Sequence, residues 1–205
     1  EREIVAYHES GHAIVASFLP EMDPVHKLSI VQRGFGALGY TMQLPLEDRY
    51  LMQRRDLQHQ LAVLLAGRTA EELALGEIST GAQNDLQRAT DIARAMVTEY
   101  GMSDELGLIN YDGGRRSRFL DIGMGGERGL YGDDTAQRID AEIKRLVAEG
   151  HATAVRILTE QRDGLERITR RLLDIEVMEG SELRTLLGLS EPVPPAPAPP
   201  EPAQD

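Results

Sequence analysis

The residues best suited to chemistry lie near the start of the chain, in the sequence His8-Glu9-Ser10-Gly11-His12. Two histidines four positions apart share one face of a helix, so their imidazole nitrogens can bind a single zinc ion. Glu9 can reach a water at that ion without being a ligand, and can then act as a general base. Ser10 and Gly11 are small and leave room for another backbone or a substrate. The spacing predicts a zinc site with His8 and His12 as ligands and Glu9 as its catalytic carboxylate.

A third ligand is needed, because a catalytic zinc ion takes three protein ligands and keeps one position for water. The chain has no cysteine, and its three other histidines are isolated, so carboxylates are the candidates. Glu71 and Glu72 lie in a downstream predicted helix, and Asp85 lies in the first turns of the next one. Each acid also has a plain structural explanation: a solvated helix face for the two glutamates, and the positive helix N-terminus for Asp85. Spacing alone does not choose between them.

The composition excludes several other classes of protein. Among 205 residues, 34 are acidic and 22 basic, and the net charge of −12 argues against a nucleic-acid partner. Neither Lys27 nor Lys144 follows glycine, so the chain has no GxxxxGK[ST] phosphate-binding loop. The longest apolar run, from Leu61 to Ala66, is far shorter than the roughly twenty residues that cross a bilayer. The chain is expected to be soluble and globular.

The hydrophobic pattern predicts a mainly α fold with a small β-hairpin near the N-terminus. Its elements are a helix over residues 2–19, strands at 27–32 and 37–44 around a turn at 33–36, a helix over 53–75, helices begun by capping boxes at Thr80–Gln83 and Asp134–Gln137, a helix around 165–175, and a last short turn at 181–187 closed by Gly188. Alanines at 62, 66 and 70 favour close helix packing.

One domain is expected over residues 1–189, followed by a disordered proline-rich tail at 190–205. Within the domain, residues 1–111 form the catalytic part and residues 134–189 the C-terminal helices. The glycine-rich segment 112–133 is expected to be a flexible connection between them.

Several separated motifs occur in the order typical of one protein family. They are HESGH at 8–12, Gly-Ala-Leu-Gly at 36–39, Leu-Ala-Gly-Arg-Thr-Ala-Glu-Glu-Leu at 65–73, and Ser-Thr-Gly-Ala-Gln-Asn-Asp-Leu at 79–86. From about Glu3 to Gly188 the chain resembles the peptidase domain of the FtsH-type AAA+ zinc proteases, whose usual HEAGH is here HESGH. The resemblance implies that His8, His12 and Asp85 bind zinc, that Glu9 is catalytic, and that Glu71 and Glu72 are structural.

The resemblance also implies a zinc-dependent endopeptidase that degrades unfolded or membrane-extracted proteins. The substrate would lie as an extended strand along Leu38, Gly39, Tyr40, Thr41 and Met42. An AAA+ module upstream in the same chain would supply ATP and Mg²⁺ chemistry, and the protease would be a homo-hexamer. The parent protein would be anchored in a membrane, a bacterial inner membrane with the peptidase in the cytoplasm, and this chain would be its soluble fragment.

Two other functions are compatible with the motifs. One is a free-standing zinc peptidase without an ATPase partner. The other is a helical oligomerisation module in which zinc has only a structural role. Zinc content and protein cleavage measured for a Glu9→Gln variant distinguish catalysis from the purely structural role.

Overall fold

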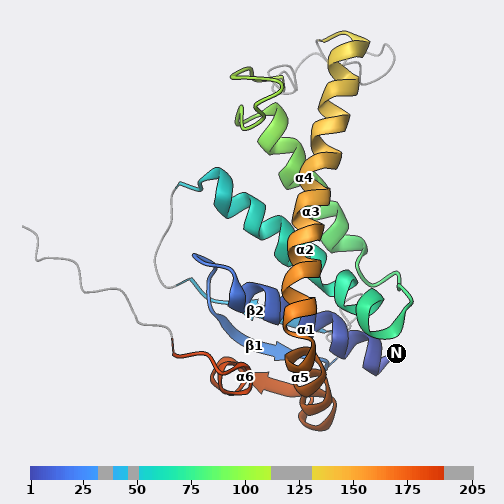
Figure 1. The fold of residues 1–205 in the computed structure, drawn as a ribbon, viewed down its shortest axis with the longest axis vertical. Coiled ribbons are helices and arrows are strands. Elements are labelled where there is room, and N and C mark those ends of the chain that lie inside the picture. Colours follow the sequence, from blue (N-terminus) through green and yellow to red (C-terminus); the bar gives the residue numbers. More distant parts are fainter. Residues whose placement is uncertain (32–38, 46–50, 112–130, 192–205) are drawn as a thin grey trace, which may run out of the picture.

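The structure, a computed structural model, describes residues 1–31, 39–45, 51–111 and 131–191. In these residues the chain forms six helices and three short strands, which confirms the mainly α fold (Figure 1). The elements are α1 (Arg2–Phe18), β1 (Val25–Ser29), β2 (Tyr40–Gln43), α2 (Arg54–Leu75), α3 (Gln83–Thr98), α4 (Asp133–Glu160), α5 (Arg162–Ile175), β3 (Val177–Glu179) and α6 (Gly180–Leu187). The predicted turn at 33–36, most of the glycine-rich connection and nearly all of the tail lie outside the described residues.

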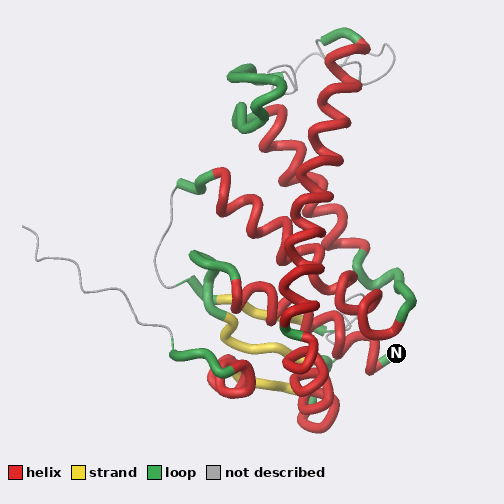
Figure 2. Tube along the Cα trace, viewed as in Figure 1, coloured by secondary structure: helices red, strands yellow, loops and turns green. Residues whose placement is uncertain are grey.

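The three strands form one antiparallel sheet in the order β2-β1-β3, at the same end of the molecule as α5 and α6 (Figure 2). In the central strand, Leu28 is opposite Thr41 of β2 on one side and Met178 of β3 on the other. Leu28 is fully buried in the apolar cluster that also contains the core residues of α1. The antiparallel pairing of the two predicted strands is confirmed, with β1 beginning two residues earlier than expected, and the predicted turn between them lies outside the described residues.

Strand β3 is an element that the hydrophobic pattern did not predict. Helix α5 ends where Glu176 adopts a left-handed conformation with φ of 62°, and the next three residues pair with β1. Only Met178 among them is buried. Three residues are too few to display a two-residue period, so this strand is recognisable only from its pairing.

Helix α2 lies at the centre of the fold and separates two apolar clusters. Leu61 and Leu65 belong to a cluster with α3 and the first half of α4, whereas Ala62 and Ala66 belong to the cluster with α1 and the sheet. The long helix α4 runs along much of the length of the molecule (Figure 1) and contributes residues to both clusters. No helix in the described parts of the chain is apolar over a length that could cross a membrane.

Helices α1 and α2 approach one another closely because small residues meet at their contact. A Cβ on Gly11 would lie 2.6 Å from the carbonyl oxygen of Ala66 and 2.6 Å from the Cβ of Ala70. The alanine spacing in α2 therefore does permit close packing, as predicted. The room left by Gly11 is taken by the backbone of α2 and not by a substrate.

Both predicted capping boxes were wrong. Helix α3 begins at Gln83 with Ala82 as N-cap, because the Thr80 carbonyl accepts a hydrogen bond from the Gln83 N–H and closes a turn before the helix. Helix α4 begins at Asp133, with Gly132 as N-cap, so Asp134 lies inside its first turn. There its carboxylate favours the helix through the positive end of the macrodipole.

Candidate metal centre

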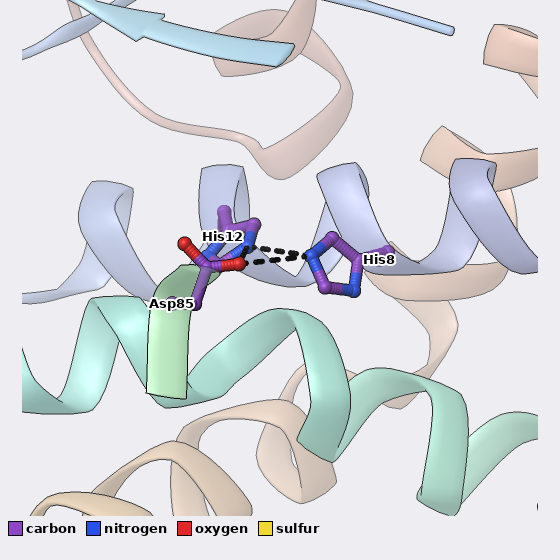
Figure 3. Close-up of side chains that lie close together, drawn as sticks. All are labelled: His8, His12 and Asp85. Atoms are coloured by element: carbon purple, nitrogen blue, oxygen red, sulfur yellow. Dashed lines mark hydrogen bonds and ion pairs between the residues drawn. The ribbon is translucent and has the colours of Figure 1, made fainter. Parts of the chain in front are cut away.

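Helix α1 brings the two histidines together as their spacing predicts. His8 Nε2 and His12 Nε2 lie 3.0 Å apart, and the two rings meet edge to face with their centroids 4.7 Å apart. Each residue is only 9% exposed. Figure 3 shows both rings on the side of α1 that faces the beginning of α3.

Asp85, in the first turn of α3, completes a group of three potential ligands (Figure 3). Its Oδ2 lies 3.3 Å from His8 Nε2 and 3.4 Å from His12 Nε2. Neither Glu71 nor Glu72 supplies an atom to this group, and Glu72 is exposed. Of the carboxylates that spacing left open, the structure brings Asp85 to the two Nε2 atoms.

The other nitrogen of each imidazole is held by an acceptor on α2. His12 Nδ1 lies 2.7 Å from the carbonyl oxygen of Val63, which can only accept, so Nδ1 carries the proton and Nε2 presents its lone pair. His8 Nδ1 lies 2.6 Å from Glu71 Oε1, an arrangement that likewise directs the lone pair of Nε2 toward Asp85 and His12. Glu71 is therefore placed to orient a histidine, a role more specific than the structural one expected for it.

Gly67 of α2 makes room for both imidazoles. A Cβ at this position would lie 2.5 Å from His12 Nε2 and 2.6 Å from His8 Nε2. Any side chain larger than hydrogen would push the two rings out of their present positions. Position 67 is thus restricted by its contact with the two imidazoles as well as by packing between helices.

The spacing of the three atoms fits a tetrahedral zinc ion. The pairs among His8 Nε2, His12 Nε2 and Asp85 Oδ2 are separated by 3.0, 3.3 and 3.4 Å. Ligand atoms about 2.0–2.1 Å from zinc at tetrahedral positions lie about 3.3–3.4 Å from one another. Two imidazoles and one carboxylate also match the donor sets of catalytic zinc sites that keep one position for water.

The charges around the site favour a cation. Burial alone would lower the pKa of His8, but its hydrogen bonds to Asp85 and Glu71 outweigh that effect and raise its pKa to about 9. Burial opposes ionisation of Asp85 as well, yet its hydrogen bonds to His12 and His8 hold the pKa of Asp85 far below the usual range. A proton on the imidazole and a metal ion compete for the same place between these groups.

Glu9 lies beside the group and not in it. The residue is 7% exposed, and burial raises the pKa of its carboxyl. Thr41 Oγ1 on β2 donates a hydrogen bond to Glu9 Oε2 at 2.8 Å. A carboxylate with a raised pKa, next to a cation site but not bound to it, is suited to accept and release a proton.

The same cleft holds the group of ligands, Glu9 and part of β2. It has a volume of about 790 Å³ and is lined by Gly39, Tyr40 and Thr41 as well as by His8, Glu9, His12 and Asp85. Of the two other residues predicted to bind substrate, Met42 lies on β2 with 37% of its surface exposed and is not part of the lining. Leu38 lies outside the described residues.

Residues 1–186 match the model of peptidase family M41. The chain belongs to this family. The resemblance drawn from the motifs is therefore confirmed, and the M41 match covers both apolar clusters as well as the metal centre.

Two curated relatives of this M41 chain are named as ATP-dependent zinc metalloproteases. This chain is 54% identical over 184 residues to "ATP-dependent zinc metalloprotease FtsH" of Syntrophobacter fumaroxidans. The aligned region covers 90% of this chain and 28% of the relative. The chain is 53% identical over 188 residues to "ATP-dependent zinc metalloprotease FtsH 4" of Synechocystis, covering 92% of this chain and 30% of the relative. The chain thus spans less than a third of the length of these relatives.

Three residues of the site carry roles that the sequence analysis did not assign. Glu71 contacts His8 across 63 positions, and Thr41 contacts Glu9 across 32. Gly67 adjoins both histidines from another helix. The Gly-Arg-Thr-Ala-Glu sequence at 67–71 does contain a signal, since Gly67 and Glu71 are four positions apart and share a helix face. Thr41 has no such signal.

Proposed function

We propose that this chain is the zinc-dependent endopeptidase portion of a longer ATP-dependent protease. The observation that carries the proposal is the convergence of His8, His12 and Asp85 beside the buried carboxylate of Glu9 in one cleft. The names of the relatives support both the metal and the reaction. Because the chain spans less than a third of these relatives, the ATP-dependent part is assigned to the rest of such a protein.

The residues of the site have separate roles in the proposed peptide hydrolysis. His8, His12 and Asp85 would hold the zinc ion, and Glu71 would keep His8 in the tautomer that presents Nε2. When bound, zinc supplies a Lewis acid for the attacking water and the scissile carbonyl. Glu9 accepts the proton of that water on its carboxylate and passes it to the leaving amine. The burial that raises the pKa of Glu9 helps it to hold the proton between these two events.

The substrate is proposed to be an unfolded or membrane-extracted protein that lies extended beside β2. In the described sheet β2 has one strand neighbour, so its other edge can pair with a peptide backbone. Gly39, Tyr40 and Thr41 would face the peptide within the cleft, with Leu38 and Met42 continuing the strand. Backbone pairing accepts many sequences, which suits a protease that degrades diverse unfolded chains.

The remaining parts of the proposal concern the whole protease. We assign to it an AAA+ module that uses ATP and Mg²⁺ to unfold substrates, a homo-hexameric ring, and an anchor in a bacterial inner membrane with the peptidase on the cytoplasmic side. The share of the relatives outside this chain leaves ample length for such a module.

The decisive experiment compares zinc content and casein cleavage for the wild type and Glu9→Gln. We expect Glu9→Gln to retain zinc and to lose cleavage by about 10²–10⁴-fold, the usual contribution of a general base. Glu72→Gln is the matched control, because Glu72 is an exposed glutamate outside the ligand group and should be neutral in both measurements. Cleavage retained by Glu9→Gln would point to another base, whereas zinc binding without cleavage by the wild type would favour the zinc-stabilised helical module.

A further inference from the structure

Strand β2 touches the carboxylate of Glu9 directly. The hydroxyl of Thr41 lies 2.8 Å from Glu9 Oε2 and 3.1 Å from the carbonyl oxygen of the same residue, and its single proton serves the shorter contact to the carboxylate. A hydrogen bond to an ionised, nearly buried carboxylate is about twice as strong as one between neutral groups. The contact therefore restricts how the Glu9 side chain turns.

Gly39, two residues before Thr41, lies against the other oxygen of the same carboxylate. A Cβ on Gly39 would lie 2.8 Å from Glu9 Oε1 and 2.9 Å from Glu9 Cγ. It would also lie 2.8 Å from the carbonyl oxygen of Ser29, so the backbone at position 39 fits between β1 and the Glu9 side chain. Gly39 and Thr41 therefore lie close to both oxygens of the Glu9 carboxylate.

The sheet fixes the register that makes these contacts. Thr41 is paired with Leu28, and paired residues of an antiparallel sheet project to the same face. Leu28 is fully buried in the cluster that includes α1. Thr41 consequently points toward α1, and a slip of one residue would turn its hydroxyl away from Glu9.

We propose that Thr41 is a positioning residue for Glu9, and that the strand which receives the substrate also sets the orientation of the proton acceptor. This inference rests on the proposed function. Its consequence is that a peptide paired with β2 would stabilise the strand that holds Glu9 in place. Substrate binding and alignment of the base would then be coupled through one hydroxyl.

The test compares Thr41→Val, which keeps the shape and removes the donor, with Thr41→Ser, which keeps the donor. In the zinc-loaded protein we expect Thr41→Val to lower kcat about tenfold or more while KM and zinc content stay within about twofold, and Thr41→Ser to restore most of kcat. Thr153→Val is the matched control, because among the described residues its hydroxyl donates to the Glu149 carbonyl on α4 alone, outside the cleft.

A second measurement does not depend on activity. Thr41→Val should lower the melting temperature of the wild type, and should have little further effect in a Glu9→Ala background, where the acceptor is gone. In the Glu9→Gln background, the dissociation constant of a fluorescent unstructured peptide should change by less than about twofold when Thr41→Val is added. A larger change would make Thr41 a substrate-binding residue instead.

The outcomes separate this inference from the proposed function. Normal kcat in Thr41→Val, failure of Thr41→Ser to restore it, or an equal loss of melting temperature with and without the Glu9 carboxylate each overturns the positioning role. Cleavage by Glu9→Gln at the wild-type rate overturns the proposed function, whatever Thr41 does. An inactive Glu9→Gln together with a fully active Thr41→Val leaves the proposed function intact and refutes only the role of Thr41.

Discussion

Glu71 joins two parts of the metal centre through its two carboxylate oxygens. Oε1 lies 2.6 Å from His8 Nδ1, and Oε2 accepts a hydrogen bond from the backbone N–H of Ser79 at 2.8 Å. Ser79 belongs to the segment between α2 and α3, which leads to Asp85. The side chain is 1% exposed, so neither bond competes with bulk water. Glu71 thus orients one proposed ligand, His8, and restrains the segment that leads to another, Asp85.

Removal of this carboxylate should weaken metal binding. We expect Glu71→Ala to raise the dissociation constant for zinc about 10–100-fold, the usual effect of losing a group that orients a ligating histidine. Glu72→Ala, at an exposed neighbouring position, should leave it unchanged. Competition with a chelator of known affinity measures both constants. Equal constants for the two variants would show that Glu71 is structural, as the sequence analysis expected.

The individual residues of the site differ in how far the sequence could reveal them. The closeness of His8 to His12, with Glu9 beside them, was predictable because this geometry is local to one helix, and their roles stay a proposal. Asp85 was one of several candidates until the resemblance to a family singled it out. Glu71 and Thr41 depend on contacts between elements far apart in the chain, and no local spacing encodes such a contact.

Among the elements, α2 supports the metal centre with its backbone as much as with its side chains. The Val63 carbonyl oxygen accepts from His12, and Gly67 lies against both imidazoles. Glu71 follows one turn later on the same face of the helix. Three successive turns of one helix therefore contact the two histidines of α1.

Gly67→Ala should consequently damage the site more than a glycine substitution normally does. Its Cβ would overlap both Nε2 atoms, so we expect a loss of about 1–3 kcal/mol in unfolding free energy from overpacking and at least a tenfold loss of zinc affinity. Gly164→Ala in α5 is the control. The atom nearest to the added Cβ would be the Leu187 methyl carbon at 3.1 Å, and this methyl group can move. Urea unfolding and zinc titration test both variants, and normal zinc binding by Gly67→Ala would contradict the tight fit.

Helices were predicted better than their ends and better than the sheet. The periodicity of α1, α2 and α5 is long enough to be recognised, whereas helix starts depend on single hydrogen bonds. The turn closed by the Thr80 carbonyl and the pairing of β3 are interactions of this kind. Strand β3 also shows that the C-terminal part of the chain completes the sheet that positions Thr41.

Across the whole molecule, α4 links the apolar cluster near the metal centre to the cluster at the other end. Ala154, Ile157 and Leu158 pack in the first, and Ile139, Ile143 and Leu146 in the second. Between the members of the second cluster lies a buried acid, Glu142, which is 7% exposed. Its carboxylate accepts hydrogen bonds from Arg145 and from the hydroxyl of Ser103. Ser103 lies in the segment that follows α3, so its bond attaches α4 to that segment, whereas Arg145 lies on α4 itself.

The Glu142 contacts should make stability depend on pH in a defined direction. The hydrogen bonds from Arg145, assisted by that from Ser103, outweigh burial and lower the pKa of Glu142 from 4.5. Because the folded-state pKa lies below the unfolded one, the stabilisation is fully present above about pH 4.5 and is lost as the pH falls through the folded-state value. We therefore expect Glu142→Gln to lower the unfolding free energy at pH 7 by about 1–2 kcal/mol, and to flatten its decline below about pH 4.5.

Glu149→Gln separates this effect from a general loss of acidic charge. Glu149 contacts the same arginine but is half exposed, and an exposed ion pair contributes little to stability. Its variant should follow the wild-type dependence on pH when both are unfolded with urea between pH 3 and pH 7 at about 0.1 M salt, where long-range charge effects are screened. If Glu142→Gln and Glu149→Gln gave parallel curves, the contacts of Glu142 with Arg145 and Ser103 would not be the source of the pH-dependent stabilisation.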